Sequence, residues 1–247
     1  MANYIKLPGS GYAVFVGDTH GDYNSTRIII NNFINKREHY IVMLGDYIDR
    51  GRESRKNIDF LLATREKHDN LVLLAGNHEM HHVRECSPSD FWDSMSTEEC
   101  DYYGEIFKSL PLAAVGNGFL ALHGALPEIS RIEDFDGIKP GDENWTSIIW
   151  GDLREKKGGK LGSFLGRPKF GEDYFTDIMD RLKMNVLVRG HDPLVPEKMF
   201  GGRCLTLFTS SAYGRERKIA LCSLEKETRS ISDMEIISLD KPEIGEI

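Results

Sequence analysis

Residues 12–21 read YAVFVGDTHG, and the same arrangement recurs in YIVMLGDYIDRG at 40–51 and in LVLLAGNHE at 71–79. In each stretch an apolar run of strand length ends at a glycine, and polar residues follow. Segments with apolar residues at helical spacing, 22–36 and 54–68, separate the three runs. This β-α-β-α-β order predicts parallel strands joined by right-handed crossovers.

The rest of the chain predicts further elements around this unit. The acidic and aromatic segment 88–110 indicates a helical cap, and 112–123 indicates a hairpin around Gly116-Asn117-Gly118. The glycine-rich segment 156–166 is expected to be a flexible loop. Later elements are expected as a helix at 172–182, a strand at 186–188 and antiparallel strands at 204–209, 218–223 and 235–239. We therefore expect an α/β (α+β) fold in a single domain, residues 1–247, with mixed or packed sheets flanked by helices.

Composition excludes several classes of protein. Hydrophobic residues make up 40% and charged residues 28%, which is typical of globular proteins. The net charge of −8 and the absence of a Lys/Arg block argue against a nucleic-acid partner. The longest apolar runs, about five residues, are too short for a membrane span, and the first residues lack a secretory pattern. Four cysteines without a CxxC pair are expected to be reduced thiols, so we expect a cytoplasmic protein.

Polar side chains follow each of the three leading strands, where parallel strands share one sheet edge and ligands bind. These side chains are Asp18, His20, Asp46, Asp49, Asn77 and His78. Two later apolar runs also end in a histidine, His123 and His191. Taken singly, each could be a turn or cap residue. Together, carboxylates and imidazoles without thiolates predict a site for two divalent metal ions, with manganese first and iron or zinc as alternatives.

The ordered motifs GDTHG, GDYIDRG and GNHE are followed by HGA at 123–125, RGH at 189–191 and TLFTSSAYG at 206–214. This set resembles the signature of the phosphoprotein phosphatases, the serine/threonine phosphatases of the calcineurin-like metallophosphoesterase superfamily. The resemblance implies a β-sandwich flanked by helices. It also implies hydrolysis of a phosphorylated protein or a small phosphoester by water that two metal ions activate for in-line attack on phosphorus.

The resemblance further implies a role for each matched residue. Six residues are implied as metal ligands, with Asp46 bridging the two ions: Asp18, His20, Asp46, Asn77, His123 and His191. Three are implied to bind the phosphate group: Arg50, Asn77 and Arg167. His78 is implied as the general acid for the leaving oxygen, and Asp49 as the residue that orients its ring. Trp150-Gly151-Asp152 resembles the family's Trp-x-Asp element and is implied to support the cleft.

Alternatives stay open at this point. Residues 78–82 also fit HExxH, which in zinc proteases requires a regular helix. A dinucleoside tetraphosphatase, or another small-molecule phosphatase or diesterase of the superfamily, would use nearly the same residues. A non-catalytic scaffold with this fold is a third alternative. The segment 209–214 departs from the family pattern, which leaves substrate choice open, and regulatory subunits are unknown.

Overall fold

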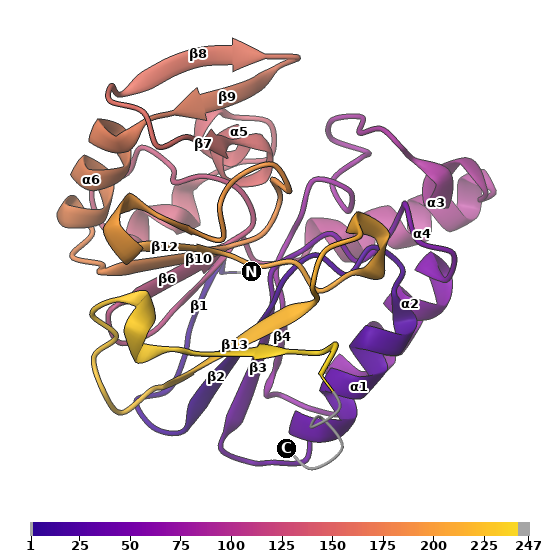
Figure 1. Cartoon of the computed structure of the whole chain (residues 1–247). Helices are drawn as coiled ribbons and strands as arrows, with labels where there is room; N and C mark the ends of the chain where they lie inside the picture. The colour runs from indigo at the N-terminus through magenta and orange to yellow at the C-terminus, as the bar shows by residue number, and fades with distance from the viewer. Residues whose placement is uncertain (1, 242–247) are drawn as a thin grey trace.

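Two β-sheets pack face to face in the computed structural model, which describes residues 2–241 (Figure 1). The first sheet has the order β14-β13-β2-β3-β4. Its strands are β2 (Tyr12–Val16), β3 (His39–Met43), β4 (Leu71–Leu73), β13 (Lys218–Ser223) and β14 (Glu235–Ser238). Strands β2, β3 and β4 pair in parallel, which confirms the prediction for the first third of the chain. Strand β13 runs antiparallel to both β2 and β14.

The second sheet has the order β1-β5-β6-β10-β12-β11. Its strands are β1 (Tyr4–Lys6), β5 (Ala113–Val115), β6 (Phe119–Leu122), β10 (Val186–Arg189), β11 (Lys198–Met199) and β12 (Cys204–Thr206). The predicted β5–β6 hairpin is confirmed. The prediction of an antiparallel strand at 204–209 is correct only for one edge of β12, which pairs antiparallel with β11 but in parallel with β10, in a different sheet from β13 and β14. All three residues of β12 are buried, as suits an interior parallel strand.

Alternating side chains of the central strand β2 serve two different cores. Ala13 and Phe15 point into the space between the sheets. Val14 and Val16 point to the opposite face, into a separate core that also holds residues of the covering helices. This alternation is the period of two expected for a strand buried on both faces. Phe15 meets Phe119 of the other sheet edge-to-face, with ring centroids 5.1 Å apart.

Helices cover the outer faces of the two sheets (Figure 1). The α-helices are α1 (Tyr23–Phe33), α2 (Ser54–Arg65), α3 (Asp90–Asp93), α4 (Thr97–Lys108), α5 (Glu143–Trp150) and α6 (Glu172–Arg181). The short 3-10 helices are η1 (Ile132–Gly137), η2 (Phe200–Gly202), η3 (Ser211–Tyr213) and η4 (Ile231–Asp233). Helix α1 starts where the Asp22 side chain accepts a bond from the Ser25 N–H at 3.0 Å. No helix within residues 2–241 combines the length and the apolar character needed to cross a membrane.

A small third sheet corrects another prediction. It consists of β7 (Asp152–Leu153), β8 (Lys160–Phe164) and β9 (Arg167–Phe170), so part of the expected flexible loop is a strand. Strands β8 and β9 form a hairpin whose two connecting residues, Leu165 and Gly166, have φ angles of 49° and 75°. Two consecutive residues with positive φ are the requirement of a tight hairpin turn. The glycines of this segment serve the hairpin and do not indicate a mobile loop.

Candidate active site

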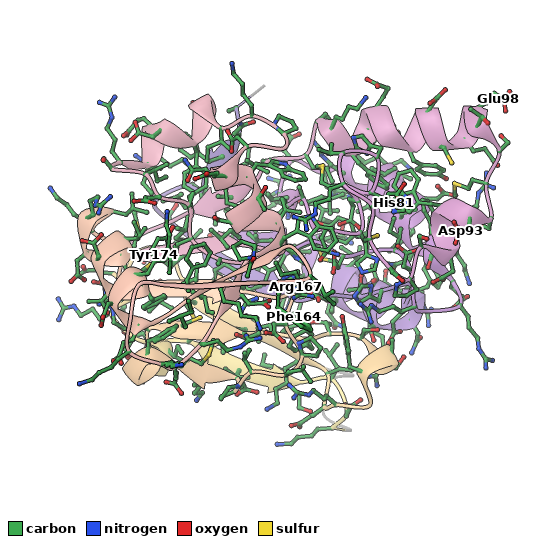
Figure 2. The ribbon with its side chains drawn as sticks, turned by 90° about the horizontal axis from the view of Figure 1, so that it is seen from above. His81, Asp93, Glu98, Phe164, Arg167 and Tyr174 are labelled. Carbon is green, nitrogen blue, oxygen red and sulfur yellow. The ribbon has the colours of Figure 1, made fainter. Side chains whose placement is uncertain are left out.

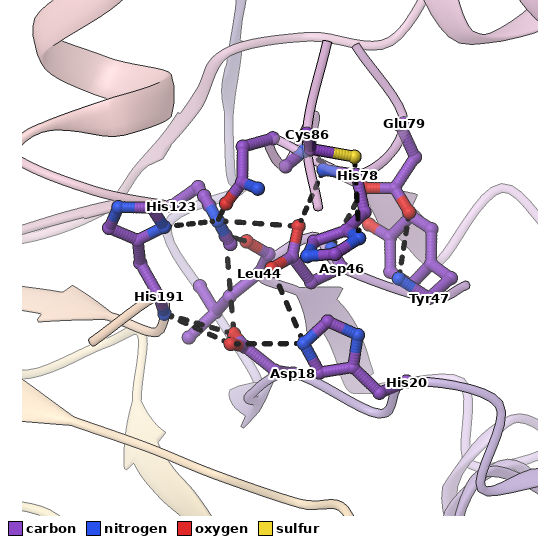
Figure 3. Close-up of polar contacts among 12 residues, drawn as sticks. Asp18, His20, Leu44, Asp46, Tyr47, His78, Glu79, Cys86, His123 and His191 are labelled. Carbon is purple, nitrogen blue, oxygen red and sulfur yellow. Dashed lines mark hydrogen bonds and ion pairs between the residues drawn. The ribbon is translucent and has the colours of Figure 1, made fainter. Parts of the chain in front are cut away.

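The ends of β2 and β3 bring the first predicted ligands together (Figure 3). His20 Nε2 lies 3.9 Å from Asp18 Oδ2 and 3.5 Å from Asp46 Oδ2. The Nδ1–H of His20 donates to the Ile48 carbonyl at 2.7 Å, so Nε2 keeps its lone pair toward the carboxylates. His20 Nε2 is also a buried nitrogen without a hydrogen-bond partner among the described residues.

The remaining predicted ligands lie on the other side of Asp46 (Figure 3). His123 Nε2 is 3.4 Å from Asp46 Oδ1 and 3.2 Å from Asn77 Oδ1. Its Nδ1–H donates to the Leu44 carbonyl at 2.9 Å. His191 Nδ1 lies 3.1 Å from His123 Nε2. All six predicted metal ligands therefore lie in one buried cluster, and Asp46 faces both groups of histidines.

The backbone at these positions adopts conformations that bulky residues rarely take. Five candidate site residues have φ angles between 40° and 74°: His20, Asp46, Asp49, Arg50 and His191. Each such residue costs of order 1–3 kcal/mol and persists only where its surroundings enforce it. A glycine is required at position 76, just before Asn77, because a Cβ there would lie 2.4 Å from the Asp46 backbone nitrogen. The strained backbone conformations are therefore concentrated in the segments that follow the strands and carry the proposed site residues.

Glu79, which we did not predict as a site residue, ties two of the motifs together. Its carboxylate accepts backbone N–H bonds from Asp46 and Tyr47 at 2.8 Å and from Gly76 at 3.1 Å. The side chain is completely buried. Burial, and then the charge of Asp46, raises the pKa of Glu79 well above its usual value. The last letter of GNHE is the signal in the sequence that marks this residue.

His78 and Asp49 form the predicted pair. His78 Nδ1 lies 2.6 Å from Asp49 Oδ2, and both residues are buried. The segment after Pro88 supports this pair, because the Phe91 N–H donates to Asp49 Oδ1 at 2.7 Å and the Trp92 indole N–H donates to the His78 carbonyl at 2.9 Å. The segment predicted as a helical cap is therefore two helices, α3 and α4, and α3 holds the His78–Asp49 pair.

The alternative zinc-protease helix is contradicted by the same region. Residues 77–83 form successive turns and no helix. His82 is exposed, and His78 belongs to the buried cluster. The two histidines of HExxH therefore do not share one helix face.

Burial governs the electrostatics of the cluster. It raises the pKa of Asp18 well above its usual value, with a further contribution from the charge of Asp46. Burial also lowers the pKa of His20 to about 3 and lowers that of His191 well below its usual value. Burial opposes ionisation of Asp46 as well, but the neighbouring His123, His78 and His20 together lower its pKa. Neutral imidazoles and buried carboxylates next to one another are a set of ligands that suits divalent cations.

Two arginines predicted to bind phosphate border the site in different ways. Arg50 is exposed, and its guanidinium lies 5.7 Å from the Tyr213 ring. Arg167, on the hairpin in Figure 2, is half-buried; its Nη2 donates to Asp152 Oδ1 at 2.7 Å and lies 2.7 Å from His191 Nε2. A pocket of 300 Å³ opens beside Arg50. It is lined by His20, Gly21, Asp22, Arg50, Gly51, Arg52, Glu53, Ser211 and Ala212.

Two further residues at the site lack an assigned role in the sequence analysis. The Tyr213 hydroxyl donates to Asp18 Oδ2 at 3.4 Å, and its ring centroid is 5.3 Å from that of His20. The feature of the sequence that pointed to Tyr213 was its position in the motif TLFTSSAYG. Arg189 is completely buried, and its three guanidinium nitrogens have no hydrogen-bond partner among residues 2–241. Burial lowers the Arg189 pKa, opposed by the charges of Asp192, Asp152 and Asp18.

Residues 13–194 match the model of the calcineurin-like phosphoesterases. The chain belongs to this family. It is 26% identical over 228 residues to a "Probable serine/threonine-protein phosphatase" of Encephalitozoon cuniculi, covering 85% of this chain and 49% of that one. The phosphoesterase chain spans about half the length of the first curated relatives that it matches. The predicted resemblance to serine/threonine phosphatases is confirmed.

Solved structures resemble this phosphoesterase along almost its whole length. A protein serine/threonine phosphatase from Saccharomyces cerevisiae has a TM-score of 0.77 at 21% identity, covering 98% of this chain and 86% of that one. A cold-active protein-tyrosine phosphatase from a Shewanella species has a TM-score of 0.60 at 16% identity, covering 97% and 83%. These likenesses confirm the predicted fold class.

Proposed function

We propose that this chain hydrolyses phosphate monoesters, with phosphoserine and phosphothreonine side chains of proteins as its substrates. The observation that carries the proposal is the buried cluster at the strand ends, in which His20 and His123 both turn Nε2 toward Asp46. The names of the curated relatives support a protein substrate.

The proposed ligands divide around Asp46. Asp18 and His20 would hold one cation, and the shared Asp46 would contact both. The other cation would be held by Asn77, His123 and His191. When bound, two divalent ions supply Lewis acidity and convert water into a nucleophile near neutral pH. Oxygen and imidazole donors without a thiolate suit manganese, which we propose as the working metal, with iron or zinc as alternatives.

His78 is proposed as the general acid. Its Nδ1 is engaged by Asp49 at 2.6 Å, so its Nε2 is the atom left to give a proton to the departing oxygen. The ring lies edge-on to His20 with centroids 4.7 Å apart, which keeps it beside the proposed ligands. An alkoxide is a poor leaving group, so a positioned acid contributes roughly 10²–10⁴-fold to the rate.

Arg50 and Arg167 are proposed to grip the phosphoryl oxygens, together with the amide of Asn77. A guanidinium binds two oxygens of a phosphate with parallel N–H bonds. Arg50 is exposed and lines the pocket. Arg167 is paired with Asp152, so binding of phosphate would divide its donors between the two anions.

A direct comparison of substrates tests the proposal. The manganese-loaded chain is given a phosphothreonine peptide, a phosphotyrosine peptide and diadenosine tetraphosphate, and kcat/KM is measured for each. We expect the phosphothreonine peptide to be hydrolysed fastest and chelation to abolish turnover. Faster hydrolysis of the dinucleotide would instead assign a dinucleoside tetraphosphatase, and no turnover of any of them would favour a non-catalytic scaffold.

We also propose a cytoplasmic location. The four cysteines are all free within the described residues, and three of them are buried. Free thiols are typical of compartments that keep cysteine reduced. The proposal is tested by fractionating cells of the source organism and probing for the chain, and recovery from an oxidising compartment would contradict it.

A further inference from the structure

A second cluster of buried donors lies on the Asp49 side of His78. Potential ligand atoms of Asp49, His78 and Cys86 all lie within 4.8 Å of one another. Cys86 Sγ is 3.6 Å from His78 Nδ1 (Figure 3). It is 3.9 Å from Asp49 Oδ2. Cys86 has no part in the proposed phosphatase mechanism, so its place in this cluster calls for a separate explanation.

The spacing of these atoms is close to that of zinc ligands. Zinc lies about 2.3 Å from thiolate sulfur and about 2.0–2.2 Å from imidazole nitrogen or carboxylate oxygen, which in a tetrahedron separates the ligands by roughly 3.3–3.6 Å. The two distances from Cys86 Sγ, 3.6 and 3.9 Å, are near that range. The hydrogen bond between Asp49 and His78, 2.6 Å long, would have to open by roughly 0.7 Å.

His81 holds the cysteine in place. Its Nδ1 accepts a bond from the Cys86 backbone N–H at 3.1 Å and lies 3.4 Å from Cys86 Sγ. The His81 ring in turn stacks on Trp92, with centroids 5.6 Å apart. The thiol is therefore presented to His78 and Asp49 by packed neighbours, which is the support that a metal ligand needs.

The electrostatic surroundings favour a cation at this position. Burial, and then the charges of Asp49, Asp46 and Glu79, raises the pKa of the Cys86 thiol. The carboxylates that oppose a thiolate would attract a dication, and a coordinating thiol loses its proton.

We propose that Asp49, His78 and Cys86 form a third metal site, which binds zinc and inhibits the enzyme. The Cys86 S–H bond breaks and its proton passes to solvent, while a sulfur–zinc bond forms. As Nδ1 binds the ion, the acid form of His78 loses its Nδ1 proton to solvent and becomes a neutral imidazole that keeps its proton on Nε2. Thiolate and carboxylate together balance the charge of the dication. Thiolate sulfur favours zinc over manganese, which separates this site from the catalytic pair.

Inhibition follows from the loss of the general acid. With Nδ1 bound to zinc, His78 is no longer the doubly protonated ring that serves as the acid, and Asp49 no longer orients it. This consequence rests on the proposed function, whereas binding of the ion by Cys86 does not. The two parts are therefore tested by different measurements.

Binding is tested by titrating cobalt into the manganese-loaded full chain. Cobalt is a spectroscopic stand-in for zinc, and its bond to a thiolate gives a charge-transfer band in the near ultraviolet. We expect a third equivalent of metal and this band in the wild-type chain, and only two equivalents without the band in Cys86→Ser. Cys100→Ser is the matched control, because Cys100 is only half-buried and lies outside the cluster. The absence of the band from the wild type, or its persistence in both Cys86→Ser and Cys86→Ala, would overturn the site.

Inhibition is tested with a phosphopeptide and added zinc. We expect Cys86→Ser to keep its activity without zinc and to need at least roughly tenfold more zinc for half-inhibition than the wild type and Cys100→Ser. Equal sensitivity of all three chains would overturn the inhibitory role. If no chain hydrolyses the phosphopeptide but the cobalt band follows Cys86, the metal site stands and the proposed function fails.

Discussion

The edge formed by β2, β3 and β4 and the hairpin β8–β9 both contribute to the candidate active site, in contrasting ways. At the strand edge, donors such as Asp46 are completely enclosed and their backbone is held by the Glu79 carboxylate. On the hairpin, Arg167 remains half-exposed and is held through side-chain contacts with Asp152 and His191. The donors at the strand edge are buried among backbone hydrogen bonds, whereas Arg167 on the hairpin is partly accessible to solvent.

The difference has a physical basis. The two cations proposed for the strand edge would tolerate little error in ligand position, and the buried hydrogen bonds and positive φ angles there fit that requirement. A guanidinium can bind two phosphate oxygens through its planar fork, and Asp152 holds the Arg167 side chain beside His191. Substitutions at the strand edge should therefore affect metal binding, and those on the hairpin should affect substrate binding.

The largest effect is expected for Asp46→Asn, which removes the charge that both groups of histidines face. We expect loss of at least one bound metal and a fall in kcat/KM of about 10⁴-fold, equivalent to about 5 kcal/mol. Metal content by elemental analysis and peptide turnover check this. The exposed Asp101→Asn is the control. Full metal content in Asp46→Asn would break the assignment of the strand edge to metal binding.

His78→Asn should reduce catalysis without reducing metal binding at the strand edge. We expect metal content to stay at the wild-type value, while turnover of a phosphothreonine peptide falls by about 10³-fold. Turnover of p-nitrophenyl phosphate should fall far less, because its leaving group departs without a proton. Equal losses on both substrates would contradict the role of His78 as the acid.

Glu79→Gln should destabilise the strand edge without replacing any of the proposed metal ligands. The neutral amide cannot accept the three backbone N–H bonds with the strength of a carboxylate, so we expect a loss of about 1–3 kcal/mol in the free energy of unfolding. Metal affinity should fall by about 10–100-fold. Denaturant unfolding and metal titration measure both. The exposed Glu105→Gln should behave as the wild type, and identical results for Glu79→Gln would remove Glu79 from the site.

The smallest effect is expected on the hairpin, for Arg167→Lys. The ammonium keeps the charge but loses the planar fork, so KM should rise by roughly tenfold with kcat and metal affinity little changed. Steady-state kinetics and metal titration check this, with the exposed Arg229→Lys as the control. A loss of metal in Arg167→Lys would show that the hairpin and the strand edge do not act separately.

Much of the fold at the strand edge could be predicted from the sequence. Strands β2, β3 and β4 and helices α1 and α2 lie where the apolar periodicity placed them. The same reasoning failed on the hairpin, where glycines were interpreted as flexibility although Leu165 and Gly166 form a tight turn. It also failed for β12, because an apolar run indicates burial but not the sheet in which a strand pairs.

The sequence by itself determined the donors and their shared edge, since an apolar run, a glycine and a donor are neighbours along the chain and parallel strands end on one side. Only the tertiary structure decided how those donors are held. The bonds from Phe91 to Asp49 and from Tyr213 to Asp18 join residues 42 and 195 positions apart. No local pattern encodes such pairs, because they form only after the helices and sheets have packed.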